Sequence, residues 1–311
     1  MSDVSLEAGA GDLLSDAPSA FARYERIRSR LPFARYPARA LNLPGLEAVA
    51  DRVDGFLLDA FGVLNVGETA IPGAVERMAA LRARGKRLAV LTNAASYTRP
   101  QLLAKYHRLG FDFTADEVVA SRDVAVARLE TIAPGATWAA IAAAGDTFDD
   151  IPARVLDALA DPSRLDRADA ILFLSTARWS TALQRRLVAA LERRPRPLVI
   201  ANPDLVAPRE GGLTLEPGLF GHDLLDALPG VEVHWFGKPF PEAFAEGIAR
   251  TGLAPDRLAM VGDTLHTDVL GGAAAGCRSV LVTDHGLFAG RDTAPFIEAS
   301  GIVPDFIVPS P

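Results

Sequence analysis

The sequence predicts an α/β protein with a parallel sheet and two domains, and three observations support this prediction. Short apolar runs, typical of buried strands, alternate with segments typical of helices along most of the chain. The length of 311 residues is that of about two domains. The expected strands number about ten, which is high for a single sheet.

The strands are predicted from apolar runs that are too short for helices. In chain order they are expected at residues 55–59, 87–91, 138–142, 170–174, 198–201, 232–236, 258–261, 279–282 and 305–308. The helices are predicted from their start and stop residues: Pro72 suits a first helical position, and Gly85, Gly110 and Gly252 suit helix ends. They are expected at residues 19–31, 72–84, 98–109, 151–160, 180–193 and 241–251.

Composition excludes several classes of protein. The formal net charge of −7 argues against a nucleic-acid-binding protein, which usually carries a basic surface. The single cysteine, Cys277, excludes an internal disulfide and a cysteine-rich metal site. No apolar run approaches 18 residues, and the first 16 residues do not combine a basic start with an apolar run. We therefore expect a cytoplasmic protein that binds neither nucleic acid nor a membrane.

Polar residues follow several of the predicted strands, where ligands of an open parallel sheet bind. Carboxylates in such a position suit Mg²⁺, and one of them can attack phosphorus. A lysine and a hydroxyl can hold phosphoryl oxygens. Each of these residues alone could merely cap a helix or face solvent, but their order along the chain favours phosphoryl transfer. The candidates are Asp59, Thr92, Asn93, Lys238, Asp263 and Asp268.

Four short segments resemble the ordered motifs of the haloacid dehalogenase superfamily. They are residues 59–64 (DAFGVL), 91–93 (LTN), 237–239 (GKP) and 262–268 (GDTLHTD). The resemblance spans about residues 50–311. The N-terminal extension, residues 1–45, stays unmatched.

The spacing of these motifs resembles one subclass. The stretch from Asp59 to Thr92 is too short for an inserted domain, whereas the stretch from Thr92 to Lys238 is long enough for a type II cap. The segments at residues 92–96, 202–204 and 304–306 resemble the NagD-type (class IIA) sugar and nucleotide phosphatases. The resemblance implies a Rossmann-like, doubly wound core at residues 46–129 and 234–311. It also implies an α/β cap at residues 130–233, and relatives that often pair as homodimers through their caps.

The resemblance also implies a Mg²⁺-dependent phosphatase that acts on a small phosphorylated metabolite, a sugar or nucleotide phosphate. Asp59 would be the nucleophile and a metal ligand, and Lys238 would neutralise the charge of nucleophile and phosphate. Thr92 and Asn93 would bind the phosphoryl group. The other metal ligands would be the carbonyl of Phe61 and the carboxylates of Asp263 and Asp268.

Phe61 departs from the family pattern, because phosphatases of the superfamily usually have an aspartate there as general acid and base. A general acid is worth about 10²–10⁴ in rate. Two alternatives therefore stay open: a phosphate- and metal-binding module with impaired catalysis, and a metal-independent haloacid dehalogenase. His266 is a conceivable substitute acid, although a side chain that faces solvent or caps a helix is the simpler interpretation.

Three residues of the expected cap are candidates for reaching the substrate, although nothing in their spacing requires it. They are Arg178, Trp179 and Arg209.

Overall fold

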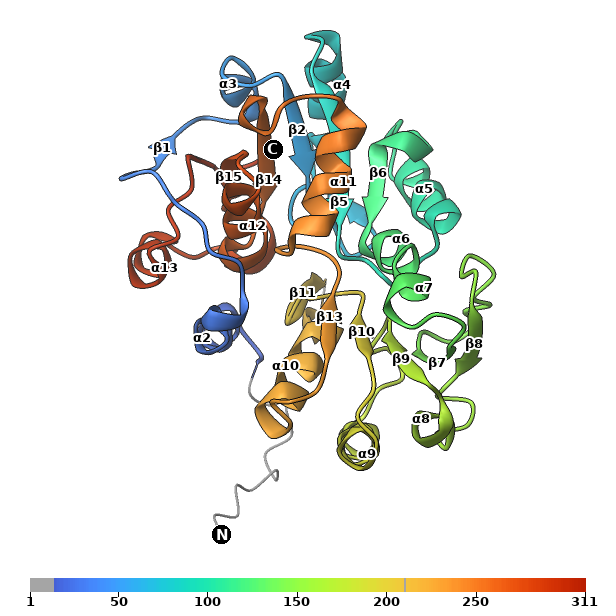
Figure 1. Ribbon diagram of the computed structural model, residues 1–311. Coiled ribbons are helices and arrows are strands. Elements are labelled where there is room, and N and C mark those ends of the chain that lie inside the picture. Colours follow the sequence, from blue (N-terminus) through green and yellow to red (C-terminus); the bar gives the residue numbers. More distant parts are fainter. Residues whose placement is uncertain (1–13, 210) are drawn as a thin grey trace.

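The structure, a computed structural model, describes residues 14–209 and 211–311, and its two largest sheets are entirely parallel (Figure 1). The seven-stranded sheet has the order β1 (Leu41–Asn42), β16 (Phe306–Val308), β15 (Arg278–Val282), β14 (Leu258–Gly262), β2 (Gly55–Leu58), β5 (Arg87–Thr92) and β6 (Val118–Ala120). The five-stranded sheet has the order β13 (Val233–Trp235), β10 (Leu198–Ile200), β9 (Ala170–Phe173), β7 (Thr137–Ile141) and β8 (Arg154–Asp157).

Helices cover both faces of the larger sheet, because alternate residues of each buried strand point to opposite faces. Phe56 and Leu58 of β2 pack toward one face, and Leu57 packs toward the other. The first face carries α3 (Leu46–Ala50), α4 (Ala74–Ala83) and α5 (Arg99–Arg108). The second face carries α6 (Ser121–Val126) and α11 (Pro241–Thr251). The prediction of a doubly wound parallel core is confirmed.

The smaller sheet has one face covered by its own helices and the other turned toward the core. Its helices are α8 (Arg164–Arg167), α9 (Thr181–Arg193) and α10 (Pro217–Ala227). On the opposite face, Trp138 and Leu172 share an apolar cluster with Leu129 of α7 (Leu129–Ile132) and with Leu57. By its pairing, β13 belongs to this sheet, so we propose the expected division into core and cap with the cap extending to Trp235.

An N-terminal helix, α2 (Ala17–Arg26), lies beside α10 of the smaller sheet (Figure 1). Asp16 caps the first turn of α2, because its side chain accepts a hydrogen bond from the Ser19 amide, 3.0 Å. The helix predicted at residues 19–31 is therefore found, but it starts and ends earlier and is followed by one 3₁₀ turn at Arg28–Arg30. Residues 1–13 of the predicted N-terminal extension lie outside the described part of the chain.

The helix predicted at residues 151–160 is wrong. The segment contains the edge strand β8, whose Arg154 pairs with Thr137 of β7. Pairing with an open sheet edge outweighs the weak helical pattern, because strand formation depends on tertiary context. The prediction also missed β6, α10 and a two-stranded hairpin of β11 (Val206–Arg209) and β12 (Gly212–Leu215).

A second small hairpin, β3 (Asn65–Val66) and β4 (Thr69–Ala70), follows β2. The remaining helices are α12 (Leu270–Ala274) and α13 (Ala294–Ser300). Among the described residues, no helix has the length and apolar character that crossing a membrane requires.

Candidate active site

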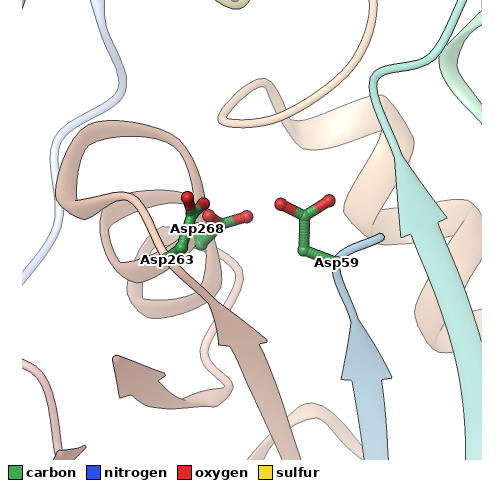
Figure 2. A group of neighbouring side chains, drawn as sticks. All are labelled: Asp59, Asp263 and Asp268. Atoms are coloured by element: carbon green, nitrogen blue, oxygen red, sulfur yellow. The ribbon is translucent and has the colours of Figure 1, made fainter. Parts of the chain in front are cut away.

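Three aspartates meet at the carboxyl edge of the larger sheet. Asp59 follows β2, and Asp263 follows the adjacent strand β14, so their parallel ends place both side chains at one edge. Asp268 comes from the turn after β14. Figure 2 shows Asp59 opposite the pair formed by Asp263 and Asp268, and one carboxylate oxygen of each lies within 4.8 Å of the others. This all-oxygen donor set suits a divalent cation.

Backbone and hydroxyl donors fix the two aspartates of the later motif. Asp263 accepts hydrogen bonds from the Leu287 amide, 2.6 Å, and from the Thr264 hydroxyl, 3.0 Å. Asp268 accepts from the Thr264 amide, 3.1 Å, and lies in a π-helical turn, Leu265–Val269. Wide turns of this kind are rare and often occur at functional sites.

Two glycines allow the chain to approach these carboxylates. Gly62 has a φ of +81°, and a Cβ atom there would lie 2.7 Å from the Asp263 carboxyl group. A Cβ atom at Gly262 would lie 2.0 Å from the Asp268 carboxyl carbon. Both positions therefore require glycine, since any larger residue would displace an aspartate of the cluster.

Lys238 joins the acidic cluster from the loop after β13. Its ammonium nitrogen lies 2.6 Å from Asp59 Oδ1 and 2.7 Å from Asp268 Oδ1, and the side chain is buried. Burial works to lower the pKa of Lys238, but Asp268 and Asp59 outweigh that effect and raise it. Lys238 is therefore a fixed positive charge beside Asp59.

The crowding of carboxyl groups shifts their own protonation. Burial raises the pKa of Asp59 to about 7, with Lys238 opposing the shift and Asp268 adding to it. Burial also raises the pKa of Asp263 to about 8, and the charges of Asp268 and Asp59 contribute. A bound cation would favour the ionised form of these groups, so cation binding would stabilise the cluster.

Thr92 and Asn93 lie at the end of β5, and both line the same cavity as Asp59. The Asn93 side-chain oxygen accepts a hydrogen bond from the Lys238 amide, 2.7 Å. Its amide nitrogen donates to the Lys238 carbonyl, 3.0 Å, and to Asp204 Oδ1, 2.8 Å. Asn93 thus links the loop that carries Lys238 to the cap residue Asp204. The contact of Asn93 with a phosphoryl group stays a prediction.

Phe61 also lines the cavity, and two cations flank its ring. The Lys105 ammonium lies 4.9 Å from the ring centroid, and the Arg209 guanidinium carbon lies 4.5 Å from it. Lys105 comes from α5 of the core, and Arg209 ends strand β11 on the cap side. The position at which phosphatases of the superfamily usually carry an acid is therefore a phenyl ring between two positive charges.

The cap closes the cavity with residues of one loop and one hairpin. These residues are Asn202, Asp204, Val206, Ala207, Pro208, Arg209 and Glu216. Asp204 and Glu216 were missed as candidate site residues. Asp204 could have been found by the rule that identified Asp59, because it closely follows the strand predicted at residues 198–201.

Of the three cap residues singled out from the sequence, Arg209 alone is among the residues that line the cavity. Arg178 binds both carboxylate oxygens of Asp157 at 2.9 Å. Trp179 donates to Gln184, 3.0 Å, and packs against Phe173. Both are occupied within the cap.

His266 is not placed to act as the substitute acid, and it neither faces solvent nor caps a helix. Its ring is buried, its Nε2 lies 2.5 Å from Glu25 Oε1, and it stacks on Tyr24 with ring centroids 4.9 Å apart. The π-helical turn points this residue toward α2 rather than into the cavity. Burial lowers the pKa of His266 although Glu25 opposes the shift.

Two family models match the chain, and both matches lie mostly in the larger domain. The model described as haloacid dehalogenase-like hydrolase matches residues 56–149, and one described as HAD-hydrolase-like matches residues 235–310. Human chronophin is 31% identical over 258 residues, which cover 78% of this chain and 86% of that protein. The chain belongs to the haloacid dehalogenase-like hydrolases. Human glycerol-3-phosphate phosphatase is 29% identical over 300 residues, 85% of this chain and 90% of that protein.

Solved structures of other haloacid dehalogenase-like hydrolases share the fold. One is described as a possible sugar phosphatase from Cytophaga hutchinsonii, with a TM-score of 0.75 and 27% identity over 87% of this chain and 98% of that one. Another is a glycerol phosphate phosphatase from Mycobacterium tuberculosis in complex with magnesium. Its TM-score is 0.61, with 27% identity over 76% of this chain and 70% of that one. The predicted superfamily and class IIA resemblance are confirmed.

Proposed function

We propose that this haloacid dehalogenase-like hydrolase is a phosphomonoesterase that transfers the phosphoryl group of a small phosphorylated metabolite first to Asp59 and then to water. The observation that supports it most strongly is the cluster of three aspartates with Lys238 2.6 Å from Asp59. The relatives that are named as glycerol phosphate phosphatases support the same class of substrate.

The carboxylates of Asp59, Asp263 and Asp268, with the carbonyl of Phe61, would hold the metal. We propose Mg²⁺, because the ligands are all oxygen and the related phosphatase from Mycobacterium tuberculosis was solved with magnesium. The ion would neutralise charge on the phosphoryl oxygens. Lys238 would keep Asp59 ionised and oriented toward phosphorus, and Thr92 would contribute a hydroxyl to the phosphoryl group.

Hydrolysis of an aryl phosphate tests this function, because a phenol leaves without help from an acid. We expect Mg²⁺-dependent turnover of p-nitrophenyl phosphate by the wild type and none above background by Asp59→Asn. Asp256→Asn, an exposed aspartate at the opposite end of β14, is the matched control and should keep full activity. Equal rates for wild type and Asp59→Asn would contradict the proposal.

Calorimetric titration with Mg²⁺ tests the metal site separately. Loss of a ligand's hydrogen-bonding partner alone costs roughly 10–100-fold in metal affinity, so Asp263→Asn should weaken binding by more than that. Unchanged affinity in Asp263→Asn would place the ion elsewhere.

Phe61 is the observation that favours a second candidate, a binding module with impaired catalysis. In that case Mg²⁺ and inorganic phosphate would bind while aryl phosphate stays intact. The expected homodimer and cytoplasmic location remain predictions, which light scattering and cell fractionation can test.

A further inference from the structure

The proposed phosphatase needs a proton donor that its first motif does not supply. When an alkyl phosphate is cleaved, the leaving oxygen must take up a proton, and a positioned acid is worth about 10²–10⁴ in rate. Phe61 has no proton to give. The inference below rests on the proposed function and concerns which residue replaces the missing acid.

Two carboxyl groups of the cap line the cavity, and their surroundings differ. Both oxygens of Glu216 are occupied: Oε2 accepts from Asn202, 3.1 Å, and Oε1 accepts from the Thr214 hydroxyl, 2.9 Å. Arg209 lies 3.5 Å from the same Oε1. Glu216 is thus held inside the cap.

Asp204 keeps one oxygen free for a ligand. Its Oδ1 accepts from Asn93, 2.8 Å, whereas Oδ2 has no hydrogen-bond donor among the residues that the structure describes. The side chain is partly exposed and lines the cavity together with Asp59 and Phe61.

The position of Asp204 is fixed from two sides. Asn202 Oδ1 accepts a hydrogen bond from the Asp204 amide, 3.0 Å, which sets the turn after β10. Asn93 binds Asp204 and the Lys238 loop with the same amide nitrogen. The Asp204 carboxyl group is therefore held at the end of the cavity where Asn93 lies, although Asp204 belongs to the cap.

The electrostatics of the cavity favour the protonated form of Asp204. Burial raises the pKa of Asp204 well above its ordinary value, and although Lys238 opposes the shift, the negative charge of Asp59 adds to it. The protonated form of a carboxyl group can donate a proton to a leaving group.

We propose that Asp204 is the general acid, and then the general base, of this phosphatase. In the first step an oxygen of Asp59 forms a bond to phosphorus, the bond from phosphorus to the ester oxygen breaks, and that oxygen takes the proton of Asp204. The products are the free alcohol, an aspartyl phosphate at Asp59 and an ionised Asp204.

In the second step the ionised Asp204 takes a proton from a water molecule whose oxygen attacks phosphorus. The bond between phosphorus and Asp59 breaks, inorganic phosphate leaves, and both carboxyl groups return to their starting forms. Asn93 acts as a positioning residue for Asp204, because its side chain contacts Asp204 and Lys238 rather than a reacting atom.

The dependence of rate on the leaving group tests this proposal. Asp204→Asn keeps an oxygen that can accept from Asn93 but has no acidic proton. We expect Asp204→Asn to lower kcat/KM for glycerol phosphate by about 10²–10⁴ and for p-nitrophenyl phosphate by less than about tenfold in the first, phosphoryl-transfer step. The Mg²⁺ affinity and melting temperature should stay those of the wild type.

Two matched variants complete the design. Asp157→Asn, a cap aspartate paired with Arg178 outside the cavity, should leave both rates unchanged. Glu216→Gln should not change the ratio of the two rates, and a selective loss on glycerol phosphate in Glu216→Gln instead of Asp204→Asn would overturn the proposal.

The outcomes separate this inference from the proposed function. An equal loss on both substrates in Asp204→Asn, or no loss on either, would overturn the role of Asp204 and leave Asp59-dependent hydrolysis intact. The role of Asp204 is also overturned, and Asp59-dependent hydrolysis stays intact, if the wild type cleaves the aryl ester but does not cleave glycerol phosphate. If Asp59→Asn matches the wild type on both substrates, the phosphatase function fails.

Discussion

Asp59 and Asp263 bind protons more tightly in the folded protein than in the unfolded chain, since burial raises the pKa of one to about 7 and of the other to about 8. The folded state therefore holds more protons between about pH 4 and about pH 8, and each group reduces the free energy of unfolding as pH rises through that interval. In the metal-free protein, these two groups therefore destabilise the folded state most at alkaline pH. A bound cation would relieve the repulsion between them there.

Asp263→Asn should reveal this contribution. In EDTA, its melting temperature relative to that of the wild type should increase as the pH rises from about 5 to about 8, because the amide cannot ionise. Adding Mg²⁺ at about pH 8 should stabilise the wild type more than the variant. Differential scanning fluorimetry measures both effects, and a difference that is constant with pH would contradict the argument.

Phe61 can be tested by restoring the usual aspartate. We expect Phe61→Asp to raise the rate on alkyl phosphates by less than about tenfold, well short of the full gain of about 10²–10⁴ from a general acid. Lys105 and Arg209, which flank the ring, would lower the pKa of the new carboxyl group and hold it ionised. Phe61→Leu is the control for loss of the ring, and steady-state kinetics on glycerol phosphate decides the result.

Among the secondary-structure elements, α2 joins the two sheets from outside the matched family segments. On the core side, Glu25 and Tyr24 contact His266 in the turn that carries Asp268. On the cap side, the Tyr24 hydroxyl accepts from the Leu205 amide, 3.1 Å, next to Asp204. The helix therefore contacts both the turn that carries Asp268 and the loop that carries Asp204, the proposed acid.

Arg23 supplies the ionic part of this attachment. Its buried guanidinium lies 2.7 Å from Asp223 and 2.6 Å from Asp226, both on α10. Arg23→Ala should lower the free energy of unfolding by about 1–3 kcal/mol, less than the 3–5 kcal/mol of a fully buried pair, because both carboxylates are partly exposed. Arg26→Ala, an exposed arginine of the same helix, should change it by less than about 0.5 kcal/mol. Urea denaturation measures both, and equal effects would show that the pairing adds nothing.

Across the whole molecule, polar contacts join core and cap around the cavity. Arg122 of α6 is buried and binds Asp146 and Asp150 of the loop after β7, with distances of 2.6 and 2.7 Å. Asn93 binds Asp204 at another point. Together with the apolar layer between the two sheets, these contacts hold the cap loop and hairpin over the aspartates.

The sequence alone predicted the fold class and the aspartate cluster. Strand and helix patterns are local, and residues after parallel strands must share one edge of the sheet, so the order of the strands and the residues that follow them were enough to place Asp59, Thr92 and Asp263 together. The gap before Lys238 likewise predicted an inserted domain, and a second sheet is found there.

Only the tertiary structure decided the contents of the cavity on the cap side. Asp204 and Asn93 are 111 positions apart in the sequence. Their contact could not be predicted, because local sequence patterns do not indicate how the cap docks on the core. The same docking brings Arg209 onto Phe61. The packing of α2 against the core holds His266 away from the site. Local sequence determines where strands end. The packing of two sheets that different segments of the chain form determines which side chains meet between them.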